Sequence, residues 1–165
     1  MNTRILQNFG TVAMLAIVIA LSLGHNAAAQ AKDREGKPKL EGTWTVQVQI
    51  VDCTSGNAMG PAFPSLLTFA RGGVLTEATA NPHFYPADRG PGHGVWSTRD
   101  TGSYAASKAF ITLNGVLQST QVIRQTIQLT GSGDSFNSAA TIQFFDPSGN
   151  LIKSGCATAV GQRFQ

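Results

Sequence analysis

Short runs of alternating apolar and polar residues, separated by turn residues, fill the chain from residue 42 almost to its C-terminal end. In the first run, residues 42–53, every second side chain is apolar over four repeats: Trp44, Val46, Val48 and Ile50. A period of two residues is typical of a β-strand with one buried face. No segment shows a persuasive amphipathic helix, so the pattern predicts an all-β protein.

Turn residues divide this region into eight predicted strands. Arg71-Gly72-Gly73 separates two of them, and the segment Asp146–Asn150 separates the last two. Glycine takes the positive φ that tight hairpins need and proline fixes φ, so both segments predict tight turns. After the first run, the predicted strands include residues 65–70, 74–80, 92–98, 103–113, 121–129, 136–145 and 151–160.

Consecutive antiparallel strands in up-and-down order can close into a barrel, which removes the exposed strand edges. Closure brings the first strand beside the last. Cys53 ends the first predicted strand and Cys156 lies in the last, so a disulfide between them would join that seam. We therefore expect an eight-stranded antiparallel barrel over residues 41–165, with a two-sheet β-sandwich as the alternative.

The first 29 residues have the composition of a secretory signal peptide. Arg4 precedes an apolar run, residues 11–24, and small residues follow that run. This order is what a cleaved signal peptide requires, and the run is shorter than the roughly 20 residues that span a bilayer. Cleavage is expected before Gln30 or before Lys32. The sequence thus predicts a secreted or periplasmic protein with no membrane span in the mature chain.

The two cysteines are interpreted in the light of export. In an exported chain an even number of cysteines favours a disulfide, and Cys53 with Cys156 is the single pairing available. The bond would close a loop of about a hundred residues. The alternatives, a thiol nucleophile or a metal-binding pair, need a reducing compartment or further ligands.

Residues 30–40 form a basic segment ahead of the first strand. The formal net charge of the whole chain is +3, and four basic residues lie in this segment: Lys32, Arg34, Lys37 and Lys39. We expect a solvated, flexible tail, with contact to nucleic acid or an anionic surface as the alternative. No nucleic-acid partner is predicted, because three acidic residues dilute the positive charge: Asp33, Glu35 and Glu41.

Gly42-Thr43-Trp44 resembles the G-x-W motif that opens the first strand in the calycin superfamily, which includes lipocalins and avidin-like proteins. In that group the tryptophan plugs one end of the barrel and a late arginine packs across its indole ring. The resemblance implies these structural roles for Trp44 and Arg163, a contact worth roughly 0.5–2 kcal/mol. The lipocalin T-D-Y motif and C-terminal helix and the biotin-site pattern of avidin are missing, so a fold is implied and no ligand. The chain also resembles small exported bacterial proteins of unassigned function.

The segment Asn81–Trp96 holds both histidines that follow the leader. A catalytic hypothesis makes His83 or His93 a general base oriented by Asp88, with Tyr85 or Arg89 stabilising a developing charge. A metal hypothesis takes His83, Asp88 and His93 as ligands. The ten positions between the histidines are wider than metal pairs in regular structure prefer, so no metal and no cofactor are predicted.

The same segment has the residues of a long crossing between strands. Three prolines stiffen it and three glycines let it bend back: Pro82, Pro86, Pro91, Gly90, Gly92 and Gly94. Long loops over a barrel mouth are rare without a function, so a crossing or lid is favoured over ligand contact, and ligand contact over catalysis. An isomerase, cyclase or hydrolase is therefore the less favoured hypothesis, and no catalytic residue is predicted.

Many small residues lie in the later strands. An eight-stranded barrel is wide enough for packed side chains or for one small ligand, so small inward residues either leave a cavity or only let the strands coil tightly. Glu77 or Arg124 becomes a polar anchor if it points inward, but we expect charged residues on strands to face water more often. Under the cavity hypothesis the ligand-binding candidates are Tyr85, Arg89, Phe110, Arg124, Phe136 and Phe144, with Ile142 as further apolar lining.

The sequence as a whole predicts an exported barrel that binds a small, largely apolar molecule. A barrel-type enzyme that uses a loop histidine is one alternative. A cell-envelope interaction module without a ligand is the other, and an exposed apolar patch would favour it. The sequence predicts no oligomeric state.

Overall fold

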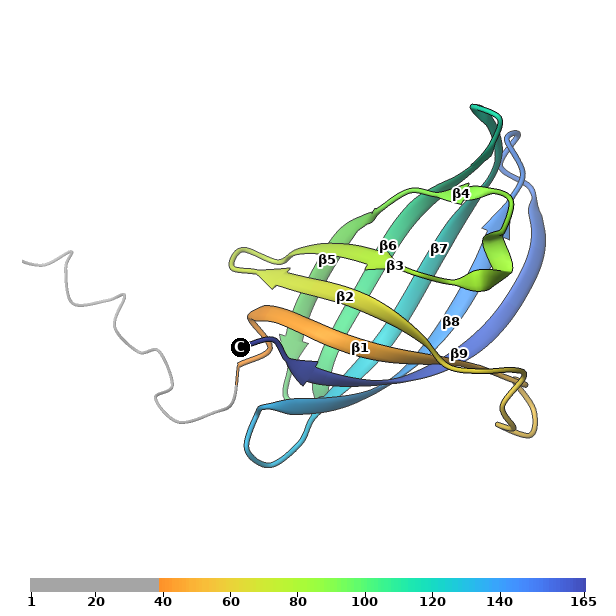
Figure 1. Cartoon of the computed structure of the whole chain (residues 1–165). Coiled ribbons are helices and arrows are strands. Elements are labelled where there is room, and N and C mark those ends of the chain that lie inside the picture. Colours follow the sequence, from red (N-terminus) through yellow and green to blue (C-terminus); the bar gives the residue numbers. More distant parts are fainter. Residues whose placement is uncertain (1–38) are drawn as a thin grey trace, which may run out of the picture. The chain divides into compact units, whose positions relative to one another are not determined.

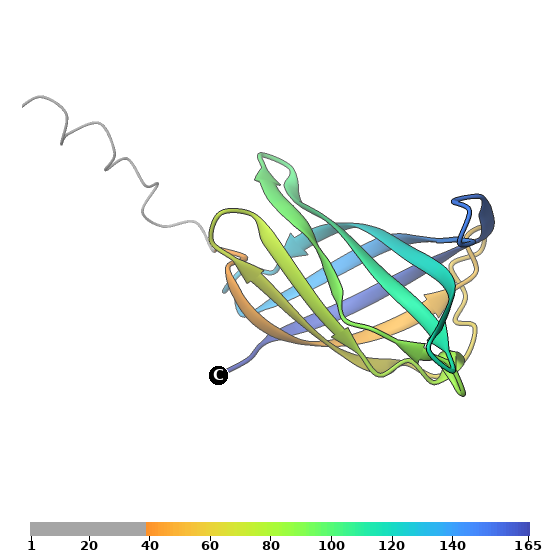
Figure 2. The ribbon, with the colours of Figure 1, turned by 90° about the horizontal axis from the view of Figure 1, so that it is seen from above.

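The computed structural model describes residues 39–165, and their strands pair in a closed ring (Figures 1 and 2). Eight strands form the ring, each antiparallel to its neighbours: β1 (Gly42–Val51), β2 (Phe63–Ala70), β3 (Val74–Thr79), β5 (Gly92–Arg99), β6 (Gly102–Leu113), β7 (Val116–Leu129), β8 (Ser135–Phe145) and β9 (Leu151–Arg163). β1 pairs with both β2 and β9, which closes the ring. The predicted up-and-down barrel is confirmed, and the sandwich alternative is wrong.

The predicted signal peptide, residues 1–29, lies outside the described residues, as does nearly all of the predicted basic tail. Within residues 39–165 there is no helix with the length and apolar character needed to cross a membrane.

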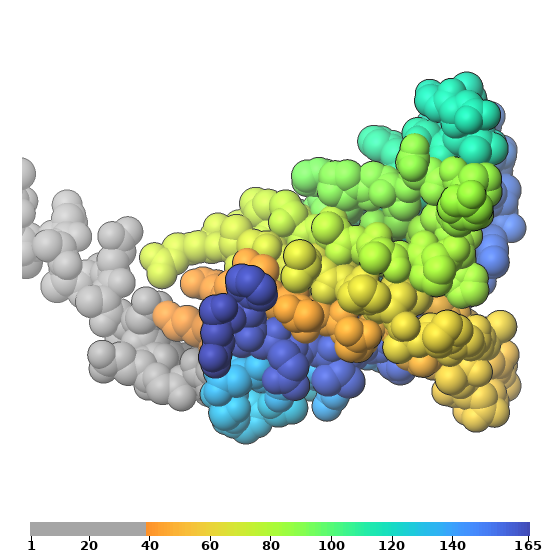
Figure 3. Space-filling view, viewed as in Figure 1, coloured from red at the N-terminus to blue at the C-terminus, as the bar shows by residue number. Residues whose placement is uncertain are grey.

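The two ends of the barrel differ in their connections (Figure 1). At the closed end lie the turns β2–β3, β5–β6 and β7–β8, together with the C-terminus and the segment that leads into β1. At the open end lie the connections β1–β2, β3–β5, β6–β7 and β8–β9. Figure 3 shows the β6–β7 hairpin and the β1–β2 connection standing out at the open end.

The β3–β5 connection contains two short elements that the sequence did not predict. One is a turn of 3-10 helix, η1 (Pro82–Phe84), capped by the Asn81 side chain, which accepts a hydrogen bond from the His83 backbone N–H at 2.9 Å. The other is β4 (Asp88–Arg89), which pairs with Ile111 and Thr112 of β6. The connection is therefore a crossing, as expected, that is attached to the open end by backbone hydrogen bonds.

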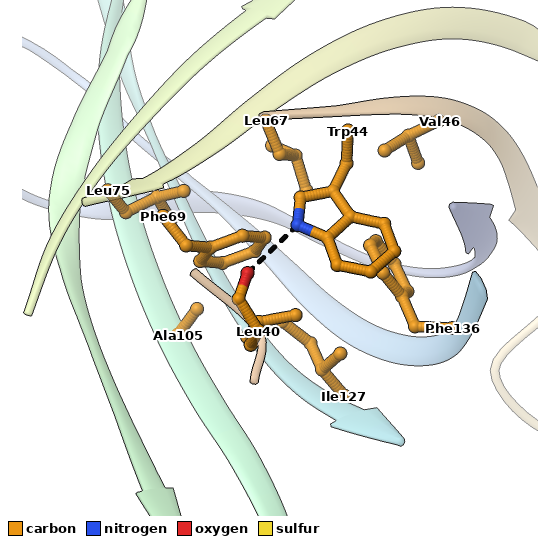
Figure 4. Packing of buried hydrophobic residues seen from close by; sticks show 9 residues of the cluster. All are labelled: Leu40, Trp44, Val46, Leu67, Phe69, Leu75, Ala105, Ile127 and Phe136. Atoms are coloured by element: carbon orange, nitrogen blue, oxygen red, sulfur yellow. Dashed lines mark hydrogen bonds between the residues drawn. The ribbon is translucent and has the colours of Figure 1, made fainter. Parts of the chain in front are cut away.

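Large apolar side chains plug the closed end (Figure 4). The ring of Trp44, which is fully buried, packs edge-on against Phe136 with the ring centroids 5.0 Å apart. Its indole N–H donates to the carbonyl of Leu40 at 2.9 Å, so the polar atom of this buried ring is paired. Leu40 is itself 2% exposed, and packing therefore begins inside the segment that the sequence assigned to the tail.

Arg163 covers the plug from outside. Its guanidinium lies 4.3 Å from the centroid of the Trp44 ring, which confirms the contact that the calycin resemblance implied. The guanidinium also donates to the carbonyls of Lys39, Glu41 and Gly133, so it joins the start of the barrel to its end. A Cβ on Gly161 would lie 2.2 Å from the Phe136 ring, so the plug requires glycine there.

The disulfide between Cys53 and Cys156 is confirmed, with a Cα–Cα distance of 5.2 Å. Cys156 pairs with Val51 across the β1–β9 seam, and Cys53 follows β1 by two residues. The bond therefore reinforces the junction at which the first and last strands meet.

Candidate ligand-binding site

A buried ion pair lies inside the barrel, between the plug and the open end. Glu77 lies on β3 two residues after Leu75, which is fully buried, so strand alternation directs both side chains inward. Arg89 arrives from β4, and its Nη2 donates to Glu77 Oε1. The Glu77 side chain is 4% exposed and the Arg89 side chain is 3% exposed.

Hydrogen bonds satisfy this pair on all sides. Glu77 accepts from the hydroxyl groups of Ser107 and Thr79, at 2.6 Å and 3.1 Å. Arg89 donates from Nε to Gln121 Oε1 at 2.6 Å and from Nη1 to the carbonyl of Gly90 at 3.2 Å. A buried pair that is neutral overall, and in which each side-chain nitrogen and oxygen has at least one hydrogen-bond partner, avoids the large cost of an isolated buried charge.

The interior has two adjoining hollows of different size. An inner cavity of about 60 Å³ extends from the ion pair toward the plug, and a mouth of about 400 Å³ faces the open end. The inner cavity has room for only a few waters, whereas pockets for small molecules typically measure 300–1,000 Å³. Five residues line both hollows and form the floor of the mouth: Ile50, Asn81, Phe84, Gln121 and Ile142.

The wall of the mouth is mainly apolar. Phe84, from the β3–β5 connection, faces Phe144 of β8 with the ring centroids 6.4 Å apart. The remaining apolar lining is Ile50, Met59, Ile111, Ile142 and Ile152. Ser119 and Gln121, both on β7, are nearly buried polar residues of this wall, with exposures of 8% and 3%. An apolar wall with a few polar groups is typical of a site that orients a small ligand.

A larger hollow of about 760 Å³ lies on the outer face, over strands β5 to β9. Its outward side chains are mostly short, and Arg124, the longest of them, donates to Gln143 at 2.7 Å. The mouth is the better candidate, because it lies within the barrel and has nearly buried polar side chains on its wall.

The structure brings two of the six ligand-binding candidates to the site. Arg89 belongs to the ion pair beside the floor, and Phe144 lines the mouth. Phe136 lies in the plug and Tyr85 is 91% exposed. Phe110 and Arg124 point outward. The buried residues of these strands, such as Ile111 and Gln121, are odd-numbered, so alternation places the even-numbered side chains on the outer face.

The catalytic candidates are not brought together. His83 is exposed at the edge of the mouth, His93 is exposed on the outer face of β5, and Asp88 is exposed on β4. Among the described residues, neither imidazole ring makes a hydrogen bond or ion pair with a carboxylate. The geometry thus gives the loop-histidine enzyme no assembled acid–base pair. Residues 39–165 also contain no group of three potential His, Cys, Asp or Glu metal ligands.

Sequence reasoning missed Gln121, Ser119 and Ser107 as site residues. Strand alternation could have identified them. Ser119 and Gln121 lie on the inward face of β7, as Ile127 does. Ser107 lies on the inward face of β6, as Ala105 does. A polar residue in an inward register needs a buried partner, and that requirement marks these positions.

No known protein-family model matches this chain, and no curated protein matches it either.

Proposed function

We propose that this protein is an exported barrel that binds a small, largely apolar molecule in its mouth. The observation that carries the proposal is the 400 Å³ mouth, whose wall is mainly apolar and includes two nearly buried polar residues, Ser119 and Gln121. Burial of apolar surface supplies the affinity, at about 25 cal/mol per Å² before the costs of association are subtracted. The inner cavity is too small for such a ligand, so binding is expected above the floor.

A fluorescence titration of the mature chain with N-phenyl-1-naphthylamine, a neutral apolar probe, tests this proposal. Ser119→Phe places a ring in the mouth and is expected to weaken probe binding at least about tenfold, or 1.4 kcal/mol. Ser97→Phe is the matched control, because Ser97 is exposed on β5 and does not line the mouth. Wild-type protein that does not bind the probe, or equal binding by both variants, would contradict the proposal.

Membership of the calycin superfamily is part of the same proposal. It is supported by the plug, in which Trp44 of the first strand closes one barrel end and Arg163 of the last strand covers its ring. A significant match to calycins from a profile built on relatives of this chain would support the membership, and a match to an unrelated barrel family would refute it.

Export is the second part, and it rests on the leader sequence. Expression in a secretion-competent bacterial host is expected to yield a mature chain that begins at Gln30 or Lys32. Intact mass and N-terminal sequencing of the secreted or periplasmic fraction measure this directly. Recovery of only the full-length chain from the cytoplasm would refute it.

An interaction module without a ligand is the second candidate. It is favoured by exposed apolar side chains at the open end, among them Tyr85, Val116 and Leu151. Val116→Ser with Leu151→Ser leaves the mouth lining unchanged and would abolish capture of a specific envelope protein if this function is correct. Unchanged capture, together with probe binding in the mouth, favours the ligand-binding function.

A further inference from the structure

The carboxamide of Gln121 has a fixed orientation and an unused donor. Arg89 Nε can only donate, so the group 2.6 Å away must be the amide oxygen. This leaves the NH2 group, which forms no hydrogen bond with any residue of the described part of the chain. Gln121 is 3% exposed and lines both the mouth and the inner cavity. Every buried side-chain nitrogen or oxygen of the described residues has a hydrogen-bond partner, so this unpaired NH2 group must reach the open space of the hollows, where it can meet an acceptor on a ligand.

A chain of hydrogen bonds holds this donor in place. Ser107 donates to Glu77, Glu77 accepts from Arg89, and Arg89 donates to Gln121. Each member is at least nine-tenths buried, so the network positions the amide before any ligand arrives. Preorganised polar groups of this kind give specificity because little ordering remains to be done on binding.

The charges around Gln121 select the chemistry of the acceptor. Glu77 already compensates Arg89, and the buried pair offers no net positive charge to an incoming anion. Lys153 also lines the mouth, but its side chain is exposed. At the Gln121 amide a carboxylate would therefore lose its hydration without gaining a buried counter-charge, whereas a neutral carbonyl oxygen loses much less. Ser119 lies two residues nearer the open end on the same face of β7 and offers a second polar contact.

We infer that the mouth recognises a small apolar molecule through a neutral carbonyl group, as in a ketone, ester or amide, bound by the NH2 of Gln121. The apolar part of the ligand lies against Ile111, Ile142 and Phe144. This inference rests on the proposed ligand-binding function and specifies its ligand class.

Three isosteric probes test the inference on the mature chain: 2-acetylnaphthalene, 2-isopropenylnaphthalene and 2-naphthoate. They share one ring system and differ in carrying a ketone, a hydrocarbon or a carboxylate. Isothermal titration calorimetry is expected to give the ketone at least about tenfold tighter binding than either other probe. Equal affinity for ketone and hydrocarbon would overturn the inference and leave the proposed function intact. Absence of binding by all three would instead refute the proposed function.

Gln121→Glu is the sharpest variant, because it keeps the shape and the acceptor for Arg89 and replaces the donor by a second acceptor. At pH 8 it is expected to remove the ketone's advantage of about tenfold while the hydrocarbon's affinity stays within about twofold. Gln121→Met, which lacks both polar atoms, gives the same comparison if the glutamate variant does not fold. A retained ketone preference in the folded variant would overturn the inference.

A measurement on the wild-type protein needs no substitution. The carbonyl stretch of 13C-labelled 2-acetylnaphthalene is expected to move to lower wavenumber on binding, relative to the same probe in an apolar solvent. A bound band at the apolar-solvent position would show that no donor reaches the ketone, and the inference would be wrong.

Discussion

Glu77 and Arg89 depend on each other, because each is buried and each would be an uncompensated charge alone. Arg89→Met is therefore expected to lower the free energy of unfolding by about 3–5 kcal/mol, whereas the double change Glu77→Leu with Arg89→Met is expected to stay near the wild-type value. Urea denaturation of the wild type, both single variants and the double variant measures the coupling. Additive losses in the double variant would mean that the pair is not coupled.

The sequence predicted the two residue pairs that hold the plug and the seam, but not the buried ion pair. Trp44, Arg163 and the two cysteines were placed correctly, because a motif, an even cysteine count and strand order each limit the choices. The partner of Glu77 was not predicted. Arg89 reaches it through a connection whose path depends on η1 and β4, and elements of three and two residues leave almost no periodic signal.

The strands and their hairpins were predictable because alternation and turn chemistry agree. The β8–β9 turn, for example, combines Gly149 at φ 89° with hydrogen bonds from the backbone and side chain of Asn150 to the Asp146 carboxylate. Which inward residues leave a cavity was not predictable, because this depends on where opposite walls of the closed ring meet. The small residues of the later strands were therefore compatible both with a cavity and with tight coiling of the strands.

The β8–β9 turn has a predictable pH dependence. The side-chain hydrogen bond from Asn150, followed by that from its backbone, lowers the pKa of Asp146 below its ordinary value of 3.8. A lowered folded-state pKa means that the stabilisation is present above pH 3.8 and is lost as the pH falls through the folded pKa. Wild-type protein is expected to melt above Asp146→Asn at neutral pH, and the difference should shrink in strong acid. A difference that stays constant with pH would contradict this assignment.

The barrel of residues 39–165 is organised in layers along its axis. An apolar plug fills the closed end, a neutral polar layer around Glu77 and Arg89 crosses the middle, and the mouth occupies the open end. The polar layer limits how deep an apolar molecule can bind. The buried apolar core and the proposed binding site therefore lie at opposite ends of the barrel.

The disulfide between Cys53 and Cys156 adds a covalent bond to the closure of the ring. The disulfide links residues 103 positions apart across the β1–β9 seam, and in the chain-entropy model such a loop adds about 4–5 kcal/mol by restricting the unfolded chain. Cys53→Ser with Cys156→Ser is expected to lower the free energy of unfolding by up to this amount in urea titrations. The wild type in reducing buffer is the matched control and should lose the same amount of stability.

The reduced protein should keep its β-sheet circular dichroism and bind the probe in the mouth. The reason is that eight cross-strand residue pairs still join β1 to β9, from Trp44 with Arg163 to Val51 with Cys156. Loss of the β signal on reduction would show that the bond, and not the strand pairing, closes the barrel.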